Sequence, residues 1–510
     1  MCSTSPIWRA LAPGETEARK GRRVTVIGAG VAGLVAAYEL ERLNYQVRVL
    51  EGNTRIGGRV HTHRFGPDPG APSVELGAMR IPNRHRRTLK YIEHLHLGEK
   101  VREFRTLLSD ENAFLHTAEG FIRIRDASGP LHRGFRRELA RERHPRSYDD
   151  ATVAFGAWLT AVVGAVAPPD LRDALREDLR RQLLDLVARV DPSPYLAGAG
   201  TAGGRVDLHA LFAAHPGIRA GCSGRLNSFL DDILTETGPT LLRIEGGMDQ
   251  LPRRLAERLR GPVSCGRKVV GIEVREHDVL VRSRAAARTV VEPSDFVVCT
   301  APFPALRRMR LTGLDADKLA VLREVDYCPA TKVAFHCREP FWQADGITGG
   351  ASFTGGSIRQ TYYPPADGGP GRGAALLASY TIGREAGRLG RMSPRRRHRL
   401  VLEELSAVHP ELLRPGMVLD AVSTAWGHTP WTVGCAMRWG KDAAEAERER
   451  ARAARPVHRL FFAGEHTSTT PAWIEGAVES ALRAVEEIDG YAPGRHRAAA
   501  LGIHDPAGAC

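Results

Sequence analysis

Several features are absent from this sequence of 510 residues, and each absence excludes a class of protein. No uninterrupted apolar run is long enough to cross a membrane, so we expect no membrane partner. The N-terminal segment has no long apolar core followed by a small-residue cleavage site, so we expect no secretory signal. The eight cysteines include no CxxC pair, which argues against a metal site and favours a reduced, cytoplasmic protein.

Positive charge is abundant but is not concentrated. The chain has 72 Lys and Arg against 59 Asp and Glu, a formal net charge of +13. The basic residues are mostly scattered arginines, and no basic motif is interleaved with aromatic side chains. We therefore predict no nucleic-acid partner. The chain is also too long for one compact core, so two or three domains are expected.

A glycine-rich stretch near the N-terminus organises the rest of the chain. Residues 24–27 predict a buried parallel strand, residues 34–42 a helix, and residues 47–50 a second strand. Between the first strand and the helix stands the pattern GxGxxG. A strand, a glycine-rich turn, a helix and a second strand in this order predict a dinucleotide-binding unit.

The residues of this pattern have separate physical tasks. Gly28 permits the tight turn, Gly30 lets the backbone approach a pyrophosphate, and Gly33 lets the helix pack closely on the sheet. The phosphates are expected at the helix N-terminus, where free N–H groups and the helix dipole favour negative charge. Glu51, at the end of the second strand, is placed to accept hydrogen bonds from ribose hydroxyls.

The middle of the chain changes in character more than once. Residues 131–147 are strongly charged and are predicted to form a connection. Residues from about 150 to 237 have helical periodicity and are predicted to form a helical insertion, with a flexible loop at residues 198–204. Strand patterns return after residue 240, and a last apolar strand is followed by a helix near residue 474. This order predicts a split dinucleotide domain with other domains inserted in it.

Two distant motifs together resemble those of the flavin amine oxidase family. The first is Ile56-Gly57-Gly58-Arg59 and the second is Phe462-Ala463-Gly464-Glu465. The stretch Gly77-Ala78-Met79-Arg80-Ile81-Pro82 is similar to one in the L-amino acid oxidase branch that ends in a substrate-binding arginine. The likeness covers residues of about 22 to 490, and the N-terminal half also resembles bacterial tryptophan oxidases.

The resemblance implies an α/β fold with FAD as cofactor. We expect a Rossmann-like FAD-binding domain that is split in sequence, a substrate domain built on a mixed sheet, and a helical insertion. The expected boundaries are 1–21 for a flexible arm, 22–80, 241–305 and 455–490 for the FAD-binding domain, 81–149 and 306–454 for the substrate-binding domain, 150–240 for the helical domain and 491–510 for a tail.

The resemblance also implies which residues hold the cofactor. Arg59 is expected to bind the pyrophosphate, Glu465 the ribityl hydroxyls, and the Val269 backbone the adenine. The N-terminus of the last helix is expected to face the flavin carbonyl edge, where negative charge grows on reduction. The full expected set is Gly28, Gly30, Val31, Ala32, Gly33, Glu51, Gly52, Gly58, Arg59, Gly77, Ala78, Met79, Arg80, Val269, Gly464, Glu465, Ala472, Trp473, Ile474 and Ala477.

Five residues are expected at the substrate. Arg80 is the natural bidentate partner of a substrate carboxylate, and Tyr380 is expected as a second carboxylate donor. Trp473, with Ala472 before it, is expected to form one wall of the site. Lys332 lies in a strand-like stretch, where a buried cation is costly without a partner. In the family this lysine holds a water near the reactive flavin nitrogen, and it is expected to assist reoxidation by dioxygen.

These residues predict oxidative deamination of an L-amino acid. The expected products are the imino acid and its 2-oxo acid, ammonia and hydrogen peroxide, with dioxygen as second substrate. Alternatives are an amine or polyamine oxidase, an amino acid 2-monooxygenase that decarboxylates its substrate, and a non-catalytic flavoprotein scaffold. Arg80 argues against plain amines, which have no carboxylate to bind.

A few residues stay open on the sequence alone. Cys435 stands near the position of covalent flavin attachment in monoamine oxidases, but the neighbouring pattern departs from theirs, so we expect non-covalent FAD. His466 is a candidate flavin contact, and Asp231 and Asp232 are candidates for the substrate entrance or simple surface acids. The family suggests a homodimer. The sequence does not predict which amino acid side chain is accepted.

Overall fold

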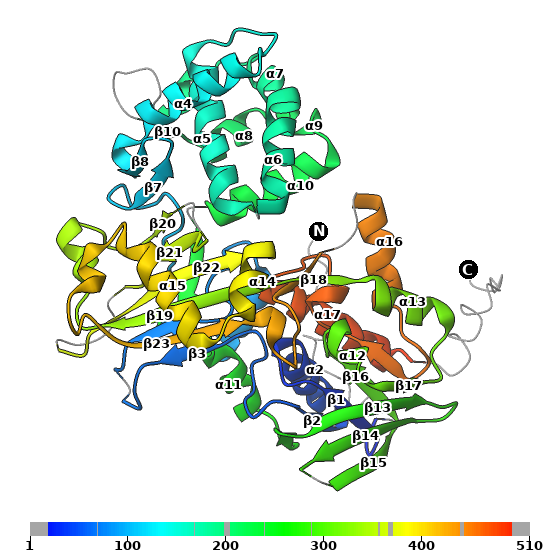
Figure 1. Ribbon diagram of the computed structural model, residues 1–510. Coiled ribbons are helices and arrows are strands. Elements are labelled where there is room, and N and C mark those ends of the chain that lie inside the picture. Colours follow the sequence, from blue (N-terminus) through cyan, green and yellow to red (C-terminus); the bar gives the residue numbers. More distant parts are fainter. Residues whose placement is uncertain are drawn as a thin grey trace.

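The structure of the chain is a computed structural model (Figure 1). It describes residues 19–68, 70–167, 169–197, 205–238, 240–286, 288–354, 357–365, 371–438 and 443–491. The loop expected at 198–204 and almost all of the expected arm and tail lie outside the described residues.

A five-stranded parallel sheet forms the base of the cofactor half. Its order is β12-β2-β1-β16-β25. The bounds are Arg23–Ile27 for β1, Gln46–Leu50 for β2, Val263–Ser264 for β12, Phe296–Cys299 for β16 and Leu460–Phe462 for β25. Strands β16 and β25 are continuous apolar runs, because both faces of the sheet are covered there. Their three main segments are brought together from the beginning, the middle and the end of the chain, as a split domain requires.

Each face of this sheet has its own core. Helices α2 (Val31–Arg42) and α17 (Ile474–Asp489) pack on one face, where Val26 and Phe461 belong to their apolar cluster. Val297 and Phe462 point to the other face and pack with a four-stranded sheet. That sheet has the order β15-β14-β13-β17, with β13 at Lys268–Val274, β14 at Val279–Ala285, β15 at Arg288–Ser294 and β17 at Arg310–Thr312.

A mixed seven-stranded sheet forms a second half of the molecule, in the order β23-β19-β22-β21-β20-β7-β8. Its strands are β7 (Phe114–Thr117), β8 (Gly120–Arg123), β19 (Ala330–Cys337), β20 (Ala351–Phe353), β21 (Gln360–Tyr362), β22 (Ala374–Ile382) and β23 (Val418–Ala425). A three-stranded sheet, β5-β11-β6, lies next to Arg80 and consists of Ile81–Pro82, Leu241–Ile244 and Val101–Glu103.

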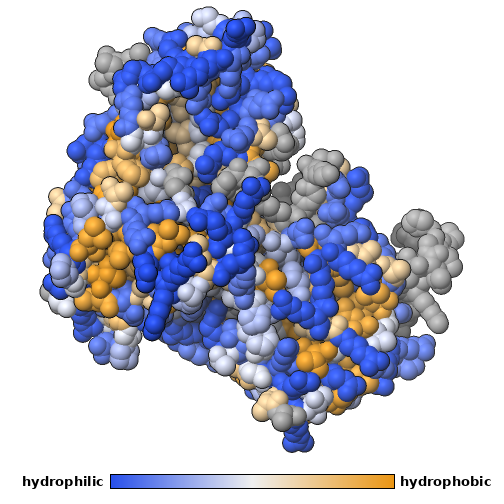
Figure 2. Space-filling model, viewed as in Figure 1, coloured by the Kyte–Doolittle hydropathy of each residue, from blue (hydrophilic) through white to orange (hydrophobic). Residues whose placement is uncertain are grey.

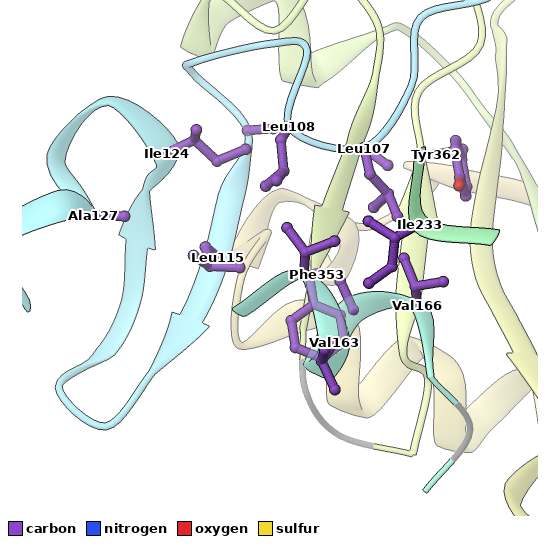
Figure 3. Close-up of a cluster of buried hydrophobic side chains, with 14 of the residues drawn as sticks. Leu107, Leu108, Leu115, Ile124, Ala127, Val163, Val166, Ile233, Phe353 and Tyr362 are labelled. Atoms are coloured by element: carbon purple, nitrogen blue, oxygen red, sulfur yellow. The ribbon is translucent and has the colours of Figure 1, made fainter. Parts of the chain in front are cut away.

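The expected helical insertion is present and forms the upper lobe of Figure 1. It comprises α5 (Asp150–Val166), α6 (Pro169–Asp178), a π-helical turn (Leu179–Leu183), α7 (Leu184–Val187), α8 (Leu208–Ala214), α9 (Pro216–Ala220) and α10 (Gly224–Glu236). Asp149 caps α5 by accepting a hydrogen bond from the Thr152 N–H. Apolar side chains join this lobe to the mixed sheet: Val163, Val166 and Ile233 lie in one cluster with Phe353 and Tyr362 (Figure 3).

The prediction of a connection at residues 131–147 is wrong for most of this range, because α4 spans Ser128–Arg141. The high charge density is typical of a connecting segment, but these charged residues lie on the exposed face of an amphipathic helix. Phe135 on the buried face packs against Gly156 of α5. Glu138 forms ion pairs with Arg176 at 2.7 Å and Arg180 at 3.1 Å.

The other helices and strands connect or flank these layers. They are β3 (Thr62–Arg64), β4 (Ser73–Glu75), α3 (Arg86–His94), β9 (Leu196–Ala197), β10 (Arg205–Val206), α11 (Gln250–Glu257), α12 (Phe303–Leu306), α13 (Ala316–Glu324), β18 (Asp326–Cys328), α14 (Gly383–Arg391), α15 (Pro394–Ser406), β24 (Ala436–Arg438) and α16 (Ala443–Ala454). Within the described residues, no helix is long and apolar enough to span a membrane. The expected domain boundaries stay a prediction.

Candidate cofactor and substrate site

One cavity of about 1520 Å³ runs between the parallel sheet, the mixed sheet and the helical lobe. Of the residues expected at the site, all but Gly33 line it. The lining includes residues of α6 and α10 on one side and of α16 on another. In Figure 2 a hollow separates the helical lobe from the part of the molecule that carries α16, and the visible face is mostly hydrophilic.

The glycine-rich turn has the geometry that a dinucleotide requires. Gly28 has φ +103°, and a Cβ on Gly33 would lie 1.9 Å from the Gly28 carbonyl oxygen, so Gly33 is a packing residue. Helix α2 begins at the cavity with Gly30 as its N-cap and has no side-chain cap, which leaves its N-terminus open to an anion. The Glu51 carboxylate at the end of β2 accepts hydrogen bonds from Ala29 N and Asn53 N, both at 2.7 Å.

Arg59 and Glu465 lie together although 406 positions separate them in sequence. Arg59 Nη1 donates to Glu465 Oε1 at 2.7 Å and to the Cys435 carbonyl at 3.0 Å. The second oxygen of Glu465 accepts from Ala472 N at 3.0 Å. The two motifs that carried the family resemblance are therefore joined by one charge-assisted hydrogen bond in the cavity wall.

The start of α17 forms another wall. Trp473 is its N-cap and has no side-chain capping bond, so this helix N-terminus is also open toward the cavity. The indole ring packs edge-on against His85 with 5.2 Å between ring centroids. Ala472 has φ +68°, an unusual conformation for a non-glycine residue, and its N–H is held by Glu465. The Thr88 N–H donates to Glu475 Oε2 at 2.8 Å, which fixes the first turn of α17 to α3.

Arg80 lies at the substrate end of the cavity with its side chain 6% exposed. Its Nη1 donates to the Tyr362 hydroxyl at 3.0 Å, and its Nη2 forms an ion pair with Glu236 at the end of α10. Phe104 lies beside the guanidinium, with 5.9 Å between Arg80 Cζ and the centroid of the Phe104 ring. No pattern in the sequence indicates a role for Glu236 or for Tyr362 at this end of the cavity.

Lys332 and Tyr380 face each other across β19 and β22. Lys332 Nζ donates to the Gly77 carbonyl at 2.7 Å, to the Glu75 carbonyl at 3.1 Å and to Met79 Sδ at 3.4 Å. It also lies 4.8 Å from the centroid of the Tyr380 ring. Burial lowers the pKa of Lys332 to about 7, although the nearby Glu75 carboxylate opposes that shift.

The remaining candidates have different positions. His466 is fully buried behind Gly464, packs against Phe303 at 4.6 Å between ring centroids, and is absent from the cavity lining of the described chain. Asp231 is exposed and pairs with Arg219, whereas Asp232 lines the cavity. Cys435 lines the cavity near Arg59, and within the described residues it is in no disulfide.

We expect the flavin to be bound without a covalent bond to Cys435. The hydrogen bond with the Cys328 thiol, together with burial, raises the pKa of the Cys435 thiol, which disfavours the thiolate needed for attachment. Precipitating the purified holoprotein with acid should leave the yellow colour in the supernatant. Colour that stays with the pellet, and is lost from it in the Cys435→Ser variant, would contradict this expectation.

The cavity fits FAD on observations of this chain alone. Two helix N-termini without side-chain caps open into it, at Gly30 and at Trp473. A Cβ added to Gly30 would meet only the Gly58 backbone, at 4.0 Å, which leaves room for close approach of a phosphate. Within the described residues no cluster of His, Cys, Asp or Glu could hold a metal ion.

The fold and this site define a flavoprotein of the amine oxidase type, and comparison with known proteins agrees. The sequence profile of the family "Flavin containing amine oxidoreductase" matches residues 31–489, and the chain belongs to this family. The predicted fold class, FAD cofactor and oxidoreductase class are therefore confirmed.

Comparison with individual proteins narrows the resemblance within this family. The chain is 56% identical over 472 residues to the flavin-dependent L-tryptophan oxidase RebO of Lentzea aerocolonigenes, covering 92% of this chain and 98% of that protein. It is 30% identical over 481 residues to the L-amino-acid oxidase of Mus musculus, covering 92% and 71%. The predicted resemblance to the L-amino acid oxidases is thus confirmed. A solved structure of putrescine oxidase is similar with a TM-score of 0.63 at 21% identity, covering 92% of this chain and 99% of that one, which bears on the fold alone.

Proposed function

We propose that this chain is an FAD-dependent L-amino acid oxidase whose substrate is L-tryptophan or a close aromatic analogue. The observation that carries the proposal is a buried arginine, Arg80, in the same cavity as the dinucleotide-binding turn. Arg80 pairs with Glu236 in the structure, and a substrate carboxylate is the kind of anion that can take the place of Glu236 on the guanidinium. The likeness to a tryptophan oxidase supports an aromatic side chain, and so do the apolar residues Leu171, Leu175 and Phe229 in the cavity wall.

The cofactor half binds FAD through backbone groups and a few charges. The N-terminus of α2 receives the pyrophosphate, and Arg59 adds a positive charge beside it. Glu51 accepts from ribose hydroxyls, since each carboxylate oxygen that accepts one backbone N–H keeps a second lone pair. Glu465 accepts from ribityl hydroxyls, the Val269 backbone contacts the adenine, and the N-terminus of α17 faces the flavin carbonyl edge.

The substrate half orients the reacting carbon. Arg80 binds the carboxylate, Tyr380 donates a second hydrogen bond to it, and Trp473 with Ala472 walls the site beside Cα. The imino acid leaves the cavity, and its hydrolysis in water gives the 2-oxo acid and ammonia. When bound, FAD supplies the hydride acceptor and the electrons that convert dioxygen to hydrogen peroxide. Lys332 places a positive charge where reduced oxygen species develop.

A peroxide screen of the purified holoenzyme tests the proposal. Hydrogen peroxide should form fastest with L-tryptophan, more slowly with other aromatic amino acids, and not with putrescine or tryptamine. Indole-3-pyruvate and ammonia should form in equal amounts. Indole-3-acetamide as product would instead identify the decarboxylating monooxygenase. Failure of all twenty amino acids to bleach the flavin anaerobically would overturn the proposal.

Two further parts of the proposal concern the protein in the cell. We propose a cytoplasmic location, supported by eight cysteines without CxxC pairs. We also propose a homodimer, by analogy with the family. Light scattering on the purified protein measures its mass directly, and a mass near 55.7 kDa would contradict the dimer.

A further inference from the structure

The substrate-binding arginine of this chain already holds a carboxylate of its own. Arg80 and Glu236 form an ion pair in which the Arg80 side chain is 6% and the Glu236 side chain 22% exposed. An ion pair between one well-buried and one partly buried group is costly to break, because each charge loses its partner inside the protein. Glu236 occupies Nη2 and Tyr362 occupies Nη1, so a substrate carboxylate that takes the same guanidinium atoms must displace Glu236.

The fold holds Glu236 firmly at this position. It is the last residue of α10, and Ile233 one turn earlier is fully buried in the cluster with Val166 and Tyr362 (Figure 3). The Thr235 hydroxyl donates to the Asp231 carbonyl at 2.7 Å and accepts from Arg84, which fixes the end of the helix to the segment after Arg80. The packed end of α10 thus holds the Glu236 carboxylate next to the Arg80 guanidinium.

The charges around Glu236 explain why a carboxylate is needed here. Two further cations lie near it: Arg359, which is 5% exposed, and Lys332. Arg359 Nη2 donates to the Val166 carbonyl, while its buried Nε has no hydrogen-bond partner in the described structure. Glu236 therefore faces three cations, Arg80, Arg359 and Lys332. Removing Glu236 would leave Arg80 without its carboxylate partner and would make this group of side chains more positive.

We propose that Glu236 is a substrate-recognition residue that exchanges partners when the substrate binds, an inference that rests on the proposed function. In the free enzyme Glu236 occupies the carboxylate site on Arg80. In the first-formed complex the substrate carboxylate takes Arg80, and Glu236 becomes the counter-ion of the substrate ammonium group. The zwitterion thus replaces one buried ion pair by two and leaves neither Arg80 nor Glu236 without a partner.

This exchange selects for zwitterions. A carboxylic acid without an amino group must also displace Glu236 but offers it no cation in return. Such a ligand leaves the Glu236 carboxylate partly buried beside a second anion, which costs binding free energy. The enzyme is therefore expected to bind an α-amino acid more tightly than its des-amino analogue. The difference in binding free energy should exceed what the contacts of the ammonium group alone contribute, because the analogue also leaves Glu236 without a cation.

Glu236→Gln separates the two effects, because the amide keeps the shape and removes the charge. Indole-3-propionate is titrated against the oxidised holoenzyme and followed by the flavin absorbance change. L-tryptophan binding comes from the concentration dependence of anaerobic flavin reduction. With Gln at this position, indole-3-propionate should bind about tenfold tighter and L-tryptophan about tenfold weaker.

Asp231→Asn is the matched control, since Asp231 lies on the same helix, is exposed and pairs with Arg219 away from the cavity lining. Both ligands should bind this variant as they bind the wild type. Glu236→Asp, which keeps the charge but withdraws it from Arg80, should shift indole-3-propionate in the same direction as Gln and to a smaller extent. This second variant decides between the outcomes if the Gln variant fails to retain FAD.

The outcomes distinguish this inference from the proposed function. Constants for the two ligands that move in the same direction, or stay unchanged, in the Gln variant would overturn the partner exchange while leaving an amino acid oxidase intact. Wild-type enzyme whose flavin responds to neither ligand would overturn the proposed function and this inference with it.

Discussion

Replacing Arg80 by alanine should raise the KM for L-tryptophan by about 100-fold, because the substrate carboxylate then lacks its cation. The loss should fall mainly on KM, since the arginine binds a group that does not change charge during the reaction. The side chain is 6% exposed and its pair with Glu236 is broken as well, so the free variant also loses some stability. Steady-state peroxide production across a range of tryptophan concentrations measures the effect.

Two comparisons isolate the carboxylate contact from a general loss of structure. Tryptamine, which has no carboxylate, should be no poorer a ligand for the Arg80→Ala variant than for the wild type. Arg102→Ala is the matched protein control, because Arg102 lies on β6 of the sheet next to Arg80 and pairs with Glu245 at the surface but does not line the cavity. Its KM should stay within about threefold of the wild-type value, as expected for an exposed surface side chain. A KM that is unchanged in Arg80→Ala would refute the carboxylate assignment.

The cofactor half could be predicted well because its signals are local. The strands expected at 24–27 and 47–50 agree with β1 and β2 to within a residue, since most of their residues are apolar and buried. Gly28 and Gly33 have the turn and packing roles that the GxGxxG spacing predicted. A short pattern contains everything that such a turn requires, so one stretch of sequence is sufficient to identify it.

The residues around Arg80 in the substrate half could not be predicted in the same way, because they come together through contacts between distant parts of the sequence. Tyr362 is 282 positions from Arg80, and Glu236 reaches the same guanidinium from the helical lobe. Nothing in the local pattern around Glu236 distinguishes it from the exposed acids Asp231 and Asp232 of the same helix. A buried arginine does predict that an acid must lie nearby, but which acid it is follows from how α10 packs.

Replacing Lys332 by methionine should slow reoxidation of the reduced flavin by dioxygen about 100-fold while leaving anaerobic reduction by L-tryptophan far less affected. The reason is that the ammonium supplies a positive charge for developing superoxide, whereas hydride transfer from the substrate has no need of it. Stopped-flow mixing of the reduced enzyme with oxygenated buffer measures this step separately. Lys318→Met is the matched control, because Lys318 is also a buried lysine, bonded to the Arg452 and Ala453 carbonyls and absent from the cavity lining.

The rate at which dioxygen reoxidises the reduced flavin should also depend on pH. Burial lowers the pKa of Lys332 to about 7, with Glu75 and Glu236 opposing the shift and Arg80 adding to it. The ammonium form therefore predominates below about pH 7 and is lost above it, so reoxidation of the wild type should slow as pH rises through this range. The methionine variant should be slow at every pH, because it never carries the charge. A wild-type rate that is independent of pH would argue that the three acceptors of Nζ, the Glu75 and Gly77 carbonyls and Met79 Sδ, keep this lysine charged throughout. A fast methionine variant would remove Lys332 from the oxygen reaction altogether.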